Sequence, residues 1–90
     1  MLIVMNIQAE ERTLYLKGIL TSDTINAIWG TDAQQLANID YINVSQLDRV
    51  DSSGLALMVY FCIKYEIKLI KPTPQLKSLI DLYDLTTVVL

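Results

Sequence analysis

Hydrophobic and polar residues alternate over residues 13–20, so that every second side chain shares a face. A period of two is typical of a strand with one buried side. The apolar, β-branched run Leu2–Ile7 predicts another strand before it. Because only the polar residues 8–12 separate these two runs, we expect them to form a hairpin.

The pattern then changes to helical spacing. Thr21, Ser22 and Asp23 offer side chains that can cap a helix, and apolar residues follow on one face. Gly30 weakens this helix near its middle. The run Ile39–Val44 returns to a period of two and predicts a third strand. The apolar positions of the helix predicted after Thr21 are Ile25, Ile28, Trp29 and Leu36.

A second helix is predicted to begin near Ser53. From Leu55 onwards, apolar residues recur at positions i, i+3, i+4 and i+7, which is one face of a helix. Ile67–Ile70 is a short β-prone run, and it predicts a fourth strand that ends at the following Lys-Pro pair. The first face of the helix predicted to begin near Ser53 comprises Leu55, Met58, Val59 and Cys62.

The last helix has the clearest start signal. Thr73 can cap it, and Pro74 suits its first position. Residues 86–90 are β-prone, but the pattern leaves them unassigned. Strands that alternate with helices after an opening hairpin predict a single α/β domain over residues 1–90, with a mixed sheet of about four strands and about three helices. The apolar stripe of the last helix, which begins at Pro74, comprises Leu76, Leu79, Ile80 and Tyr83.

Composition narrows the possible functions. Hydrophobic residues make up 52% of the 90-residue chain, which is enough for one core. The net charge is −3 and the seven Lys and Arg are scattered, which argues against a nucleic-acid partner. With no His and a single Cys, Cys62, the chain lacks the residues for an internal disulfide or a Cys/His metal site. We expect Cys62 to be a small buried hydrophobe.

Membrane insertion is not expected. The longest uncharged run, Ser52–Ile63, is shorter than the roughly 20 residues that span a bilayer. Residues 1–7 lack the basic region, the apolar length and the cleavage site of a signal peptide. We therefore expect a soluble cytoplasmic protein.

The segment Asp51-Ser52-Ser53-Gly54 stands where the third strand gives way to the second helix. Carboxylate and hydroxyl oxygens can accept hydrogen bonds from the first N–H groups of a helix, so the segment has a structural explanation as a cap. A serine nucleophile lacks its usual His base here, and the Gly-x-Ser-x-Gly order is absent. A phosphate-binding loop lacks its glycines and its Gly-Lys-Ser/Thr end. We therefore expect no catalytic residue and no cofactor.

The helix after this segment is apolar on a second face as well. A helix that is apolar all round is normally buried on all sides, but a small one-sheet domain has little protein to cover both faces. We therefore expect part of this second face to be an exposed surface for a protein partner. Its residues are Ala56, Leu57, Tyr60, Phe61 and Ile63.

Residues 50–57, VDSSGLAL, resemble the signature of the STAS family, the sulphate transporter and anti-sigma factor antagonist domains. The resemblance covers essentially the whole chain and extends to Pro74-x-Leu76-x-x-Leu79 in the last helix. It implies a STAS fold, in which helices pack on one face of a mixed sheet. It also implies a protein that works by docking onto other proteins.

Within this family the chain looks most like the small cytoplasmic STAS subunit of the Mla phospholipid transporter. Leu20-Thr21, Ile28-Trp29 and Leu82-Tyr83-Asp84-Leu85 carry that likeness. It implies a non-catalytic subunit at the inner membrane that binds the ATPase of an ABC transporter, in complex with its permease, and helps to maintain outer-membrane lipid asymmetry. Ser52 stands where that subunit has a threonine, while Asp51 and Gly54 match directly.

One departure keeps an alternative open. Ser53 matches the serine that is phosphorylated in anti-sigma factor antagonists, whereas the transporter subunit need not have a hydroxyl there. The alternative function is therefore an antagonist that is switched by phosphorylation at Ser53. In either case the expected partner-binding residues are Asp51, Ser52, Ser53, Gly54, Leu57, Tyr60 and Phe61.

Overall fold

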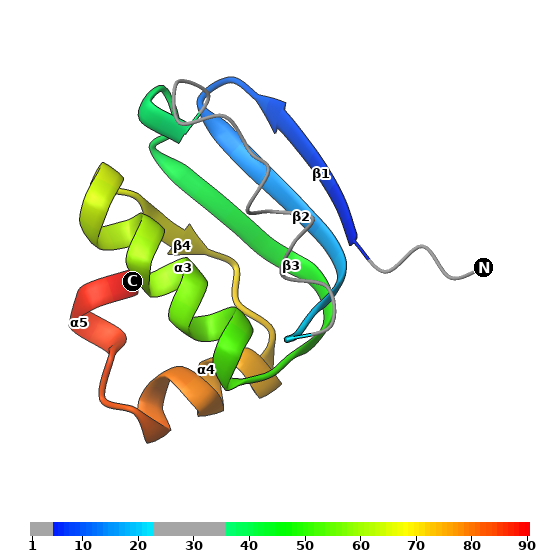
Figure 1. The fold of residues 1–90 in the computed structure, drawn as a ribbon, viewed down its shortest axis with the longest axis vertical. Coiled ribbons are helices and arrows are strands. Elements are labelled where there is room, and N and C mark those ends of the chain that lie inside the picture. Colours follow the sequence, from blue (N-terminus) through cyan, green and yellow to red (C-terminus); the bar gives the residue numbers. More distant parts are fainter. Residues whose placement is uncertain (1–4, 23–35) are drawn as a thin grey trace.

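The computed structural model describes residues 5–22 and 36–90. Its sheet has the strand order β1-β2-β3-β4 (Figure 1). The pair β1 and β2 is antiparallel, whereas β2–β3 and β3–β4 are parallel, so the predicted mixed sheet of four strands is confirmed. The elements are β1 (Met5–Glu10), β2 (Thr13–Leu20), β3 (Tyr41–Val50), α3 (Ser52–Tyr65), β4 (Lys68–Ile70), α4 (Pro74–Leu82) and α5 (Thr86–Val89).

Two sequence predictions fall partly outside the described residues. Residues 2–4 of the first predicted strand are among them, and the described strand β1 begins at Met5. Most of the helix predicted after Thr21 is also outside. Leu36 and Ala37 are helical in the described part, and the Leu36 side chain is buried.

The predicted hairpin joins β1 to β2 through a two-residue turn. Glu11 and Arg12 form it with positive φ angles of 49° and 66°, which matches the twist of the flanking strands. The Arg12 guanidinium contacts the Asp40 carboxylate at 2.6 Å, and the Arg12 carbonyl accepts hydrogen bonds from the N–H groups of Asp40 and Tyr41. This hydrogen bond with Arg12 lowers the pKa of Asp40. The turn therefore fixes the start of β3.

Strand β3 is longer than the sequence predicted. It continues past Val44 to Val50, so that the Asp51 segment follows the strand directly. Leu47 is buried in this extension, while Ser45 and Asp48 on either side are exposed. Two register shifts against β2 interrupt the alternation of side chains. The predicted end at Val44 was wrong because the polar residues and the shifts hide the period of two.

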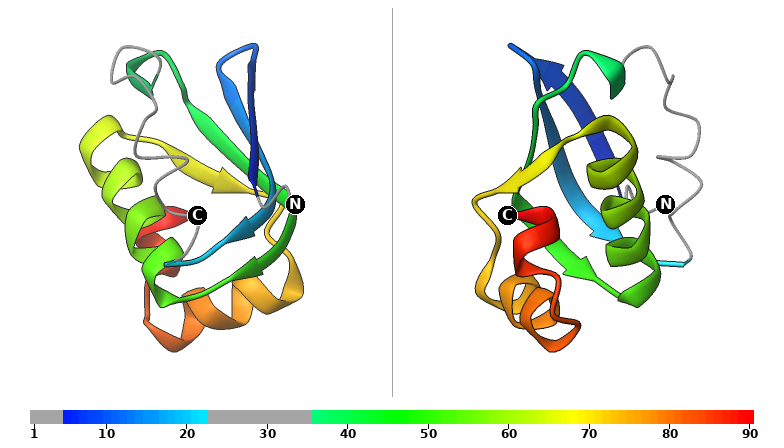
Figure 2. Two further views of the ribbon diagram at one scale, coloured as in Figure 1. Left: turned by 45° about the vertical axis from the view of Figure 1, so that its right-hand side comes forward. Right: turned by 90° about the vertical axis from the view of Figure 1, so that its left-hand side faces the viewer.

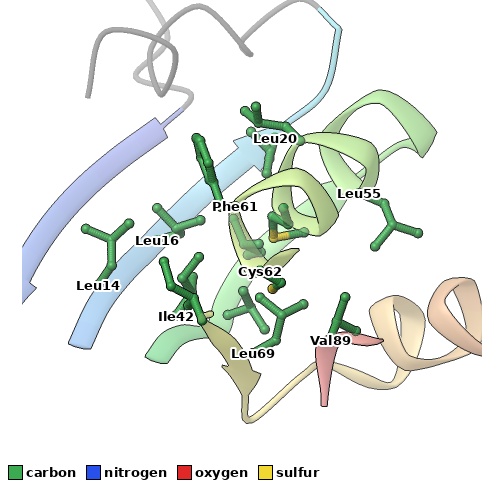
Figure 3. Close-up of a cluster of buried hydrophobic side chains, with 14 of the residues drawn as sticks. Leu14, Leu16, Leu20, Ile42, Leu55, Phe61, Cys62, Leu69 and Val89 are labelled. Carbon is green, nitrogen blue, oxygen red and sulfur yellow. The ribbon is translucent and has the colours of Figure 1, made fainter. Parts of the chain in front are cut away.

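The core lies between the sheet and α3. Strand β2 contributes Leu14, Leu16 and Leu20, all of which are at most 1% exposed. Phe61 and Cys62 extend from α3 towards these strands (Figure 3). Within the described residues, α3 contributes more buried hydrophobic side chains to this core than any other helix.

Helix α5 covers the side of α3 next to the edge strand β4 (Figure 1). Its Val89 side chain is fully buried, and the Lys68 amine of β4 donates to the carbonyls of Thr87 and Val88 at 3.4 and 3.1 Å. The unassigned, β-prone segment 86–90 is thus mostly helical. Its β-branched residues pack on a neighbouring helix, and this packing outweighs their strand propensity.

Helix α4 starts as the sequence predicted. The Thr73 hydroxyl accepts a hydrogen bond from the Leu76 N–H at 3.2 Å, and Pro74 occupies the first turn. Leu76 and Ile80 are buried, whereas Tyr83 just beyond the helix is exposed. In the two views of Figure 2, α4 lies at the end of the molecule where α3 begins. Within the described residues, no helix is long and apolar enough to cross a membrane.

Candidate docking surface on helix α3

Asp51 is the N-cap of α3. Its backbone is extended, and its Oδ1 accepts a hydrogen bond from the Gly54 N–H at 2.9 Å. Its Oδ2 accepts another from the Ser22 N–H at 3.0 Å, just after the end of β2. Desolvation raises the pKa of Asp51, but these backbone hydrogen bonds, together with one from Ser53, outweigh it, and the pKa is lowered. The carboxylate is therefore committed to holding the helix start against the end of β2.

Gly54 has a steric role in the same place. A side chain there would collide with the carbonyl oxygen of Leu20 and would lie 2.9 Å from the Leu20 Cγ atom. Only glycine lets the first turn of α3 approach β2 so closely. Gly54 is buried, so its predicted partner-binding role is not direct contact through an exposed surface.

The two serines of the segment differ in exposure. Ser52 is exposed, and Ser53 is partly buried. The sequence suggested that Asp51 and Ser52 could both cap the helix, but Ser52 is already its first helical residue and Asp51 holds the cap position. The Ser52 hydroxyl is therefore available at the surface rather than used by the helix start.

Leu57 and Phe61 were predicted to bind a partner on the second face of the helix, part of which was expected to be exposed, but both lie in the buried part of that face. They are 4% and 3% exposed. The Phe61 ring lies 5.8 Å from the Tyr60 ring and 6.2 Å from the Tyr65 ring, measured between centroids. Leu55 leaves α3 on a different side from Phe61 (Figure 3), and it is also buried. The buried arc of α3 is therefore wider than its first face alone.

The face of α3 that remains open is narrow and almost uncharged. Tyr60 is 42% exposed and Ile63 is 66% exposed, while Val59 is partly buried. The Lys64 amine donates to the Tyr60 hydroxyl at 2.9 Å, and this bond raises the pKa of Lys64. The exposure of Tyr60 agrees with its predicted place on the surface. We call this face the α3 stripe; it comprises Ser52, Ala56, Val59, Tyr60 and Ile63.

A groove of about 380 Å³ runs along the first half of the α3 stripe. Tyr83 and Leu85, from the connection between α4 and α5, form its second wall. A hydrogen bond of 2.8 Å from the Thr86 hydroxyl to Asp81 spans this connection. On the α3 side, the groove is lined by Ser52, Leu55, Ala56 and Val59.

The sequence pattern did not predict that Tyr83 and Leu85 form one wall of the groove. Tyr83 was placed on the apolar stripe of the last helix, although it lies beyond the end of α4 and is 51% exposed. The available signal was the cluster of large hydrophobic residues at 82–85 around a single carboxylate. That cluster could not be assigned to the groove without the position of α3.

The described residues offer little for chemistry. Among them, no group of three or more His, Cys, Asp or Glu side chains is close enough to hold a metal ion. Burial raises the pKa of the Cys62 thiol to about 11, so Cys62 is a protonated core residue rather than a nucleophile. What the surface does offer is apolar area beside two hydroxyls, which suits protein contact.

Comparison with known proteins identifies the fold. No protein-family model matches the chain, and no curated protein matches it by sequence. A solved structure of the anti-sigma factor antagonist SpoIIAA in its unphosphorylated form superposes with a TM-score of 0.71, over 97% of this chain and 86% of that one. The chain has the STAS fold. Because the two sequences are 17% identical, the likeness concerns the fold alone.

Proposed function

We propose that the chain is a non-catalytic docking subunit that binds the ATPase of an Mla-type phospholipid ABC transporter. Its place would be the cytoplasmic side of the inner membrane, where it supports the complex in maintaining outer-membrane lipid asymmetry. The observation that carries the docking role is the α3 stripe, an exposed apolar face beside the hydroxyls of the first helical turn. The choice of partner rests on the sequence resemblance at 20–21, 28–29 and 82–85.

The physical case for docking lies in two side chains. Tyr60 and Ile63 leave large apolar surfaces in water, and a partner that covers them gains roughly 25 cal/mol for each Å² removed from water. Tyr60 also has a hydroxyl for orientation, and tyrosine is a frequent hot-spot residue at interfaces. The exposed Ser52 hydroxyl can add a hydrogen bond at the edge of the same surface.

Replacing Tyr60 by Ala tests this proposal. The variant should remain folded, because Tyr60 is outside the core, but its affinity for the co-purified ATPase and permease should fall by about 2 kcal/mol, or about 30-fold. Titration calorimetry or biolayer interferometry with the purified complex measures the change. Tyr41→Ala is the matched control, since Tyr41 is 47% exposed on strand β3. Equal binding by both variants would place the interface elsewhere.

A second candidate is an anti-sigma factor antagonist. It is favoured by the likeness to SpoIIAA, a protein of that class, and by the position of Ser53 in the first turn of α3, directly before Gly54. In this function, phosphate on Ser53 would switch docking off. The added charge of about −2 would stand beside the Asp51 carboxylate, which already accepts the Ser53 N–H.

The state of Ser53 separates the two candidates. For the transporter subunit we expect Ser53→Ala to leave binding nearly intact, Ser53→Asp to weaken it, and intact-mass analysis of native protein to find no phosphate. A substantial phosphorylated fraction, or capture of a kinase-like anti-sigma factor in place of an ATPase, would favour the antagonist instead. Ser78→Asp is a suitable control for charge alone, because Ser78 is exposed on α4 and does not line the groove.

A further inference from the structure

Helix α5 is held in place by its neighbours rather than by its own sequence. It has four residues, Thr86–Val89, all of them β-branched, and its start has no side-chain cap. Isolated helices shorter than about 12 residues are marginal in water, and β-branched residues favour the helix only weakly. Within the described residues, α5 packs on α3 and on the edge strand β4. The helical state of this segment therefore depends on those two contacts.

The attachment of α5 is small. Val89 is fully buried, whereas Val88 is partly buried. The Lys68 amine of β4 donates to the carbonyls of Thr87 and Val88, at the end of α5 where the last carbonyls have no partner within the helix. Both of these bonds are exposed to solvent. One buried side chain and one exposed ammonium group therefore provide much of the attachment.

Helix α5 also lies where the groove on α3 would otherwise continue. Leu55 and Val59 line the groove, and Cys62 follows Leu55 by seven residues on the same face of the helix. Cys62 is nevertheless 4% exposed and does not line the groove. Leu85, which does line it, is the N-cap residue of α5, so the helix follows the groove wall directly.

The position of Lys68 connects α5 with Cys62. Burial raises the pKa of the Cys62 thiol, and the charge of Lys68 opposes this, so the ammonium group that holds α5 is also near the thiol. Figure 3 shows the Val89 side chain on the side of the core where Leu69 of β4 lies. Departure of α5 would therefore expose Cys62.

The end of α4 marks the boundary of the segment that can move. Asp84 has a positive φ of 56°, and its N–H donates to the Asp81 carbonyl at 3.1 Å. The Leu85 N–H donates to the Ile80 carbonyl at 3.0 Å. These bonds form the Schellman pattern, in which the residues after a helix are held by its own carbonyls. Leu85 is therefore fixed by α4, and the groove wall stays in place when residues 86–90 move.

We propose that residues 86–90 are a local unfolding unit, which leaves α3 and β4 while the sheet, α3 and α4 stay folded. The closed form buries Cys62, and the open form extends the groove along α3 to Cys62. A docking partner could then insert a longer apolar segment, so α5 competes with the partner for this part of α3. That consequence rests on the docking function proposed above, whereas the opening itself does not.

The reaction of Cys62 with iodoacetamide, followed by intact-mass analysis of the purified chain, measures the opening, because the chain has no other cysteine. The rate should rise only gently with urea at low concentrations, since the opening exposes little surface, and steeply where the whole domain unfolds. Val89→Ala should react at least about tenfold faster than wild type without urea, because it removes a buried contact of α5.

Leu14→Val is the matched control for Val89→Ala. Leu14 is fully buried in β2, whereas α5 packs on α3 and β4. This variant should lower the urea midpoint of global unfolding but leave the reaction rate without urea unchanged.

Lys68→Gln tests the ammonium group. Loss of the charge would by itself raise the pKa of the Cys62 thiol and slow the reaction, so a severalfold faster reaction reports opening. Lys77→Gln, at an exposed site on α4, controls for the loss of one positive charge and should react like wild type.

Several results would overturn the proposal. One is a wild-type reaction that follows global unfolding at every urea concentration, or that is as fast as in the denatured chain. Another is a Val89→Ala or Lys68→Gln variant that reacts no faster than wild type. A third is a Leu14→Val variant that accelerates as much as Val89→Ala. Because no ATPase is present, the docking role is judged separately, by the Tyr60→Ala binding measurement.

Discussion

At the scale of single residues, the four residues of the segment 51–54 have different roles. Asp51 and Gly54 build the junction between β2 and α3, the first by hydrogen bonds to two backbone N–H groups and the second by leaving room for Leu20. Ser52 and Ser53 are left with hydroxyls at or near the surface. A segment that resembles a binding site is thus half structural framework, and its variants need a stability measurement beside any binding assay.

The lowered pKa of Asp51 predicts a specific pH dependence. Because the folded-state pKa lies below the unfolded value of about 3.9, the ionised carboxylate stabilises the fold above that pH, and the contribution is lost as pH falls through the folded pKa. Asp51→Asn, which keeps a capping oxygen without the charge, should therefore be less stable than wild type near neutral pH, by up to about 1 kcal/mol. The difference should vanish in strong acid.

Urea unfolding at several pH values measures this effect. Asp48→Asn is the control, because Asp48 is an exposed carboxylate in the same region that caps no helix. A constant difference between wild type and Asp51→Asn at all pH values would mean that the ionised form of Asp51 has no special role in the fold.

At the scale of elements, α3 connects the core of the fold with the surface that we propose for docking. Leu55, Leu57 and Phe61 are buried, with Phe61 on the side of the strands, and a narrow stripe of the helix remains exposed (Figure 3). An apolar sequence alone could not say which residues belong to which side. Burial assigns Leu57 to stability and Tyr60 to the surface.

Two truncations on this helix should behave very differently. Leu57→Ala removes a side chain that is 4% exposed and should lower the free energy of unfolding by about 2–5 kcal/mol. Ile63→Ala, at a site that is 66% exposed, should change it by no more than about 0.5 kcal/mol when measured on dilute protein. Thermal or urea denaturation gives both values. Similar losses for the two variants would mean that α3 is rotated from the orientation described.

At the scale of the whole molecule, the packing of α3 on the sheet and of α5 beside the edge strand β4 explains where the α3 stripe lies. The parallel crossover from β3 to β4 runs through α3 and lays it across the sheet. Helix α5 then packs beside α3 and against β4, and the connection before α5 raises the second wall of the groove (Figures 1 and 2). The proposed docking face is the part of α3 that this packing leaves uncovered.

The sequence by itself determined the hairpin, the start of α4 and the alternation of strands with helices. These features depend on local signals: the period of side chains, the Thr73-Pro74 cap, and polar residues between apolar runs. Each acts within a few residues along the chain, so a linear pattern contains it. The same holds for the place of Asp51 at the head of α3.

Only the tertiary structure decided the end of β3, the helical state of 86–89 and the exposed side of α3. Leu47 belongs to a strand because β2 lies beside it, and Val89 is helical and buried because α3 and β4 meet it. Leu57 and Tyr60 are three residues apart and both apolar in character, yet the Leu57 side chain is buried and the Tyr60 side chain is exposed. Contacts between segments far apart in the chain decide these three features. A local sequence pattern does not show which segments will pack together.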